Sequence, residues 1–203
     1  MIEYLYRDII KESNSMEIGG DGVERKILYH GSVDIIEKPE YGKGKKHNDY
    51  GQGFYCTEDI ELAKEWACKN ETDGFVNMYT LDMSELKVLN LNSADYIILN
   101  WIAILLQNRI FHLDNDISNM AREYIIENFS VNVEQYDVVI GYRADDSYFS
   151  YAKDFLNNTI SVNQLSQAMK LGELFRQPMF LVAMLIMICA GASELTMSQW
   201  AST

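Results

Sequence analysis

The chain has 203 residues, of which 48% are hydrophobic and 23% are charged. This length fits one domain, or one domain with short appendages, and the apolar content excludes a disordered or fibrous chain. The formal net charge of −13 argues against sequence-independent binding to nucleic acid, because such binding depends on Lys and Arg neutralising phosphates.

The first third of the chain is predicted to contain one strand followed by a long loop. Residues 1–22 are a helix-compatible or linker segment that ends among closely spaced glycines. The run ERKILYHGS is apolar with β character and predicts a strand that stops at Gly31. Residues 37–53 hold Gly, Pro and Asn too densely for helix or strand. We expect a loop there, and loops of this length in compact domains are usually functional or disordered.

The middle of the chain mixes strands and helices. Thr57 is the predicted N-cap of a short helix whose apolar residues follow at helical spacing. Gly172 is expected to cap the last helix. Because the elements alternate without βαβ regularity, the sequence favours an α+β fold over a doubly wound sheet. The other predicted elements are the strands FVNMYTLDM, KVLNLN and YDVVIGY and the helices DYIILNWIAILLQNRIF, DISNMAREYIIENF, SYFSYAKDFL and SVNQLSQAMKLG.

Cysteine usage and the N-terminus indicate a cytoplasmic protein. Cys56, Cys68 and Cys189 are odd in number and form no C-x-x-C pair. We interpret them as reduced, packed thiols, which fits a reducing compartment; a reactive nucleophile is the alternative. The first residues carry acidic charges and lack an apolar stretch of signal-peptide length.

The tail that follows Gln177 differs in composition from the rest of the chain. It carries a single charge, at Glu194. Its apolar stretch, residues 178–192, is shorter than the roughly 20 residues that a membrane span needs. We expect a buried or aggregation-prone segment and no membrane partner; a membrane anchor is the less favoured alternative. The predicted organisation is an N-terminal segment at 1–22, a domain at 23–177 and an atypical tail at 178–203.

Two ordered motifs resemble those of the ADP-ribosyltransferase superfamily, in its diphtheria-toxin and poly(ADP-ribose) polymerase branch. ILYHGS is similar to the motif in which His-Gly-(Ser/Thr) follows an apolar strand, and GQGFYCTEDIELAKEWA resembles the branch's Gly-x-Gly-x-Tyr strand that leads into a helix. From about Lys26 to Gln177 the chain resembles, more closely, a family of uncharacterised bacterial domains assigned to this fold. The segments that carry this resemblance are LYHGS, NDYGQGFYCTEDIELAKEWA, LNLN, LLQNR, GYRADDSYF and AMKLGEL. The resemblance implies an ADP-ribosyltransferase-like α+β fold, a split β-sheet core with inserted helices.

The same resemblance implies that NAD binds as a substrate, and no metal is expected. His30 would bond the adenosine ribose, Ser32 would help to fix the nicotinamide, and Tyr55 and Trp66 would enclose its ring. Glycine alone lets the main chain approach the nicotinamide closely, which is the role expected of Gly31. Plain structural roles are the alternatives, core packing for His30, Tyr55 and Trp66 among them. The full set of implied NAD contacts is His30, Gly31, Ser32, Gly53, Tyr55, Trp66 and Arg143, beneath a loop at 38–50 that carries Lys43, Lys45 and Lys46. For the lysines the alternative is a solvated surface, and for Arg143 it is an ion pair with Asp145 or Asp146.

The third catalytic position departs from the family pattern. In the superfamily a carboxylate, usually Glu, bonds the ribose 2′-hydroxyl and stabilises an oxocarbenium-like transition state. The bacterial family places it in a Leu-Gly-x-Leu-Gly-Glu-Gln segment, where this chain has LGELFRQ, with Phe175 and Arg176 in place of Gly and Glu. Gln177 carries no charge but can bond a hydroxyl, and Glu173 is the nearest acid. Both therefore join His30 and Tyr55 as candidate catalytic residues.

The resemblance implies an enzyme that transfers a single ADP-ribose from NAD to a macromolecule. The expected setting is a bacterial toxin or conflict-system effector, with a cognate antitoxin or neighbouring protein as partner. A catalytically inactive NAD-binding or protein-interaction module of the same fold is the alternative, and a purely structural partner is a third. The sequence leaves the acceptor open among protein, DNA and RNA.

Overall fold

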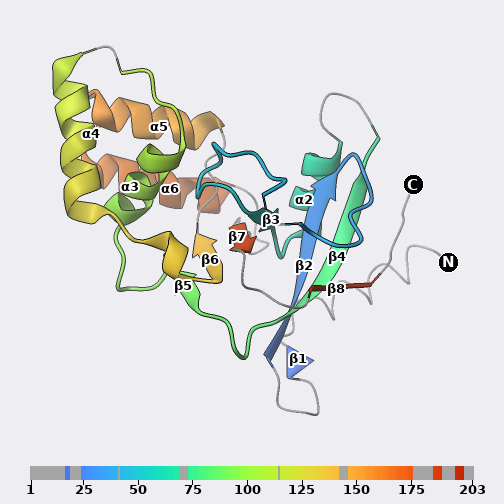
Figure 1. Ribbon diagram of the computed structural model, residues 1–203. Helices are drawn as coiled ribbons and strands as arrows, with labels where there is room; N and C mark the ends of the chain where they lie inside the picture. Colours follow the sequence, from blue (N-terminus) through green and yellow to red (C-terminus); the bar gives the residue numbers. More distant parts are fainter. Residues whose placement is uncertain are drawn as a thin grey trace. The chain divides into compact units, whose positions relative to one another are not determined.

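The computed structural model is mixed α and β, with five helices and two four-stranded sheets in the part of the chain that it describes (Figure 1). The described residues are 17–18, 24–40, 42–68, 73–113, 115–141, 146–175, 185–188 and 195–198. The chain divides into two compact units. The first comprises Met1–Pro39, Cys56–Leu86 and Ala192–Thr203, and the second comprises Glu40–Tyr55 and Lys87–Gly191.

The sheet of the first unit is antiparallel and has the strand order β1-β2-β4-β8. Its centre is the pair β2 (Glu24–Ser32) and β4 (Phe75–Asp82), which run side by side in Figure 1. The short strands β1 (Glu17–Ile18) and β8 (Leu195–Ser198) flank this pair. Both central strands lie where the sequence predicts them: β2 contains the short apolar run at residues 27–29, and β4 buries alternate residues, Asn77, Tyr79 and Leu81.

Helix α2 (Ile60–Ala67) covers β2 and buries Leu62, Ala63 and Ala67. Its N-cap is Asp59, whose carboxylate accepts a hydrogen bond of 2.8 Å from the Glu61 amide. The prediction of Thr57 as the N-cap is wrong. The Thr57 backbone instead pairs with Tyr29 of β2 through bonds of 2.7 and 2.9 Å, so the chain is still extended at this point.

The sheet of the second unit has the order β3-β7-β6-β5, with β5 parallel and β7 antiparallel to β6. All four residues of β6 are buried, which confirms the prediction that YDVVIGY forms a buried strand. The bounds of the strands are Phe54–Cys56 for β3, Val88–Asn90 for β5, Val138–Gly141 for β6 and Leu185–Ile188 for β7. The apolar tail thus contributes one strand to each sheet.

The described part of the second unit also contains four helices. As predicted, α3 (Ile98–Asn108) is largely buried, with residues 101–106 all in the core. The predicted cap at Gly172 is wrong, because α6 runs on to Phe175; a glycine inside a helix costs about 1 kcal/mol and is tolerated. The bounds of the others are Asp116–Phe129 for α4, Asp146–Leu156 for α5 and Val162–Phe175 for α6.

The structure also tests the predictions that the cysteines are packed and that residues 37–53 form a loop. Cys56 is a buried free thiol, whereas Cys68, at the end of α2, is exposed, so the expectation that it is packed is wrong. Cys189 lies outside the described residues. Over residues 37–53, Tyr41 aside, the described chain forms neither helix nor strand, which confirms the loop. Within the described ranges, no helix is both long and apolar enough to cross a bilayer.

Candidate functional site

His30, Gly31 and Ser32 are the last three residues of β2. Because successive side chains of a strand point to opposite faces of the sheet, His30 and Ser32 share one face and Gly31 belongs to the other. The register places His30 opposite Asn77 and Ser32 opposite Phe75 on β4. The predicted His-Gly-Ser motif is therefore held on a paired strand, at the point where the chain leaves the sheet.

Close packing of α2 requires glycine at position 31. A Cβ atom added to Gly31 would lie 1.9 Å from the Ala63 carbonyl oxygen, 2.6 Å from the Ala67 amide nitrogen and 2.9 Å from the Trp66 Cβ. Gly74 meets the same helix, since its Cβ would lie 2.2 Å from the Ala67 oxygen. The packing of α2 thus accounts for Gly31, and the approach of its main chain to nicotinamide stays a prediction. The same contact brings Trp66, which is half-buried, next to the motif.

Asn77 holds the chain that follows the motif. Its side chain is buried, with 2% of its surface exposed. The Oδ1 atom accepts a hydrogen bond of 2.8 Å from the Ile36 amide, and Nδ2 lies 3.0 Å from Ser32 Oγ, 3.3 Å from the His30 oxygen and 3.4 Å from the Asp34 oxygen. The Ser32 hydroxyl donates in turn to the Asp34 oxygen, at 2.5 Å. One buried amide therefore fixes the backbone on both sides of Gly31.

Tyr79, two residues further along β4, adds a second tie to this turn. Its hydroxyl donates to the Ile36 carbonyl oxygen at 2.5 Å. Burial, and secondarily the nearby Cys56, raises the pKa of Tyr79, so this hydroxyl stays a neutral donor. Burial also raises the pKa of the Cys56 thiol. A thiol held neutral is a poor nucleophile, which favours the structural interpretation of Cys56 over the reactive one.

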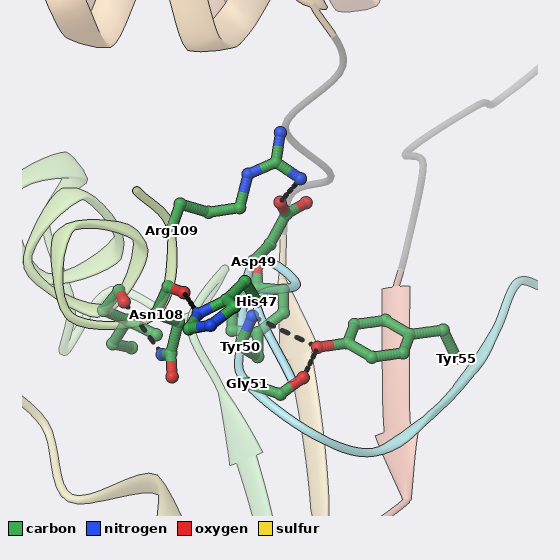
Figure 2. Close-up of polar contacts among 8 residues, drawn as sticks. His47, Asp49, Tyr50, Gly51, Tyr55, Asn108 and Arg109 are labelled. Carbon is green, nitrogen blue, oxygen red and sulfur yellow. Dashed lines mark hydrogen bonds and ion pairs between the residues drawn. The ribbon is translucent and has the colours of Figure 1, made fainter. Parts of the chain in front are cut away.

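Tyr55 belongs to the second unit, where its hydroxyl is bound to a tight turn (Figure 2). The hydroxyl donates to the Gly51 oxygen at 2.5 Å and accepts from the Tyr50 amide at 3.3 Å. Gly51 has φ = +88°, a conformation that glycine adopts without strain, and its amide donates to the Asn48 oxygen at 3.1 Å. The Tyr55 hydroxyl thus holds the end of the long loop, and the residue is half-buried.

An ion pair beside this turn was not predicted. Asp49 is buried, and its Oδ1 lies 3.4 Å from Nη1 of Arg109 (Figure 2). The Arg109 guanidinium also lies 5.1 Å from the ring centroid of Phe149, which stacks with Phe111 at a centroid distance of 4.4 Å. Both residues lie in segments that carry the resemblance, Asp49 in NDYGQGFYCTEDIELAKEWA and Arg109 in LLQNR.

The loop itself is held by hydrogen bonds from a side chain to main-chain oxygens. Gln52 Nε2 donates to the Gly42 oxygen at 2.6 Å and to the Gly44 oxygen at 2.9 Å. A Cβ at Gly44 would lie 2.6 Å from the oxygen of Gly53, the buried glycine of the predicted site. The loop lysines, Lys43, Lys45 and Lys46, are exposed, and Lys43 pairs with Glu40 at 2.9 Å. Exposure suits both the solvated-surface interpretation and the pyrophosphate-binding one.

The remaining candidates are less fully described. Glu173 lies within α6, and its side chain is outside the described part of the structure. Arg143 and Gln177 fall outside the described residues altogether. The structure therefore holds His30, Gly31 and Ser32 on β2 of the first unit, with Trp66 beside Gly31 on the face opposite to the His30 and Ser32 side chains. Gly53 and Tyr55 belong to the second unit. Among the residues that it describes, no group of three or more His, Cys, Asp or Glu could hold a metal ion.

Comparison with known proteins identifies one family. A family profile whose description reads "Protein of unknown function (DUF3990)" matches residues 26–188. No curated protein and no solved structure matches the chain. The resemblance to a family of uncharacterised domains, which begins at Lys26, is confirmed. Its assignment to the ADP-ribosyltransferase superfamily stays a prediction.

Proposed function

We propose that this chain, which belongs to the family described as protein of unknown function (DUF3990), is a transferase that moves ADP-ribose from NAD to a macromolecule. The observation that carries the proposal is the His-Gly-Ser sequence at the end of β2. His30 and Ser32 share one face of the strand, and α2 packs closely against Gly31. Two adjacent polar side chains on a rigid strand suit a ligand that needs several fixed hydrogen bonds.

The proposed reaction breaks the bond between ribose C1′ and the nicotinamide nitrogen. Nicotinamide leaves as a neutral molecule, C1′ bonds to the acceptor, and the acceptor loses a proton. Positive charge develops on the ribose as the bond breaks, so that a carboxylate near C1′ stabilises the transition state. The roles of the residues are those that the resemblance implies: His30 for the adenosine ribose, Ser32 and Tyr55 for nicotinamide, and Glu173 or Gln177 for the ribose hydroxyls.

A catalytically inactive NAD-binding module is the second candidate. It is favoured by Phe175 and Arg176, which stand where the resemblance implies Gly and Glu. An arginine in place of the acid would repel the developing positive charge on the ribose. An inactive module would bind NAD without releasing nicotinamide, whereas a transferase would do both. Measuring NAD binding and nicotinamide release on the same protein therefore distinguishes the two candidates.

NAD is expected to raise the melting temperature of the protein. A ligand that binds only the folded state stabilises it by RT ln(1 + [L]/Kd), or about 2.7 kcal/mol when the concentration is 100 times Kd. The measurement is a thermal melt with and without millimolar NAD. His30→Ala is the control variant: it should melt close to the unaltered chain without NAD and lose the shift with it. An unaltered chain that does not respond to millimolar NAD would contradict the proposal.

Two substitutions at Tyr55 separate its ring from its hydroxyl. Tyr55→Phe keeps the ring but leaves the Gly51 oxygen and Tyr50 amide without their partner, and should destabilise the fold by about 1–3 kcal/mol. Its Kd for NAD should be nearly unchanged. Tyr55→Ala also removes the stacking surface, worth about 0.5–1.5 kcal/mol, and should weaken binding up to about tenfold. Calorimetric titration measures both constants, and equal Kd values for the two variants would show that the ring does not contact NAD.

A further inference from the structure

The hydrogen bonds around Asn77 leave one proton that can change partner. Three oxygen atoms lie within 3.4 Å of Asn77 Nδ2: Ser32 Oγ, the His30 oxygen and the Asp34 oxygen. A side-chain amide has only two N–H groups. The Asp34 oxygen, the farthest of the three, is also the acceptor for the Ser32 hydroxyl. In the protein without ligand, three protons, two from the Asn77 amide and one from the Ser32 hydroxyl, are therefore shared among these three oxygens.

We propose that Asn77 is a positioning residue of the NAD site, which frees the Ser32 hydroxyl to bond the ligand; this inference rests on the proposed function. When the hydroxyl turns from the Asp34 oxygen to the nicotinamide carboxamide, it no longer has to accept a bond from Asn77. The two amide protons then cover the His30 and Asp34 oxygens. No oxygen of the turn loses its partner, so the change carries little of the penalty of a buried unsatisfied group.

The turn itself stays in place during this exchange. Asn77 Oδ1 holds the Ile36 amide at 2.8 Å, and the Tyr79 hydroxyl holds the Ile36 oxygen at 2.5 Å. Neither bond involves Ser32. Binding therefore moves a hydroxyl proton and not the backbone, which is the kind of preorganisation that keeps affinity high.

Asn77→Asp tests the role of the amide protons, because the side chain of the variant can donate a hydrogen bond only at a pH where its carboxyl group is protonated. The carboxyl group has nearly the same shape, and burial without a cationic partner raises its pKa above the ordinary value of about 3.9. Below that raised pKa the protonated acid can still donate one bond. Above it, the carboxylate faces the His30 and Asp34 oxygens and donates none. The folded pKa is the higher one, so this variant loses the contact as the pH rises.

The experiment measures Kd for NAD from about pH 5 to pH 8, a window set by the upward shifts of several units seen for buried acids. For Asn77→Asp, the ratio of Kd to that of the unaltered chain should rise at least about tenfold across this range, the effect of one lost buried hydrogen bond. Asn92→Asp, which adds the same charge at an exposed position, should give a constant ratio. A purely structural Asn77 would lower the melting temperature but leave the ratio constant, and that result would overturn the inference.

Ser32→Ala supplies a test that does not depend on how well the Asn77 variant folds. It should weaken NAD binding about tenfold and leave the Ile36 amide as protected from hydrogen exchange as before, because Asn77 holds that amide. Loss of this protection in Ser32→Ala would show that Ser32 holds the turn, and would overturn the inference. If the unaltered chain does not bind NAD, the proposed function fails and the inference with it. If the unaltered chain binds NAD but the Kd ratio of Asn77→Asp to the unaltered chain stays constant with pH, only the inference fails and the proposed function stands.

Discussion

Replacing Gly31 with alanine is expected to lower the free energy of unfolding by about 3 kcal/mol, the upper end of the usual cost of overpacking. The added Cβ would lie 1.9 Å from the Ala63 oxygen and 2.6 Å from the Ala67 nitrogen. Both are backbone atoms of α2, so no side-chain rotation relieves the overlap. Either the helix moves away from β2 or the strand shifts, and each loses buried contacts. Urea denaturation followed by circular dichroism measures the change.

Gly42→Ala is the matched control, because it adds the same methyl group where there is space. Nothing lies within 4 Å of its Cβ, but the backbone has φ = +87°. The only penalty is conformational, about 1–2 kcal/mol for a non-glycine residue in the left-handed region. Gly31→Ala should therefore be the more destabilising of the two. Equal losses would mean that α2 does not press on Gly31 as closely as described.

Arg176→Glu is expected to increase nicotinamide release from NAD by about 10²–10³-fold, the usual effect of one preorganised electrostatic contact with a transition state. The substitution restores the acid that the resemblance implies at this position. It should leave Kd for NAD nearly unchanged, because the charge on the ribose develops only as the bond breaks. Release of nicotinamide is followed by chromatography at saturating NAD.

Arg176→Gln separates the loss of a positive charge from the gain of a negative one. It should raise the rate less than Arg176→Glu does. If the unaltered chain already turns NAD over quickly, position 176 does not carry the acid, and Glu173 is the residue to replace next. If neither the unaltered chain nor Arg176→Glu releases nicotinamide while both bind NAD, the inactive-module alternative is the correct one.

The elements that the sequence predicted well are those whose signal is local. The short apolar run at residues 27–29 and the alternation over residues 75–82 predicted the central pair of strands, and the largely apolar sequence of α3 indicated its burial. These patterns depend only on neighbouring residues and on the period of strand or helix. The helix ends were predicted less well. Thr57 and Gly172 have the right chemistry for caps, but pairing with β2 and the continuation of α6 decided otherwise.

The candidate site could be predicted only in part, because its geometry depends on register. The His-Gly-Ser motif was visible in the sequence, yet nothing local indicates that Asn77 lies opposite His30. That pairing joins residues 47 positions apart, and a shift of one residue would turn Asn77 to the other face. Gly31 shows the same limit, since its contact with Ala63 exists only once α2 packs on β2. The ion pair of Asp49 with Arg109 likewise joins two distant segments.

The placement of β7 and β8 has a consequence for biosynthesis. A ribosome produces the chain from its N-terminus, so β3, β6 and β4 are made long before Leu185–Ile188 and Leu195–Ser198 can pair with them. Until then β6 and β4 each expose an unpaired backbone edge, which is a template for aggregation. Both sheets also close through contacts between distant parts of the sequence, and such topologies fold slowly. We therefore expect the yield of the protein in cells to depend on chaperones that shield open strand edges.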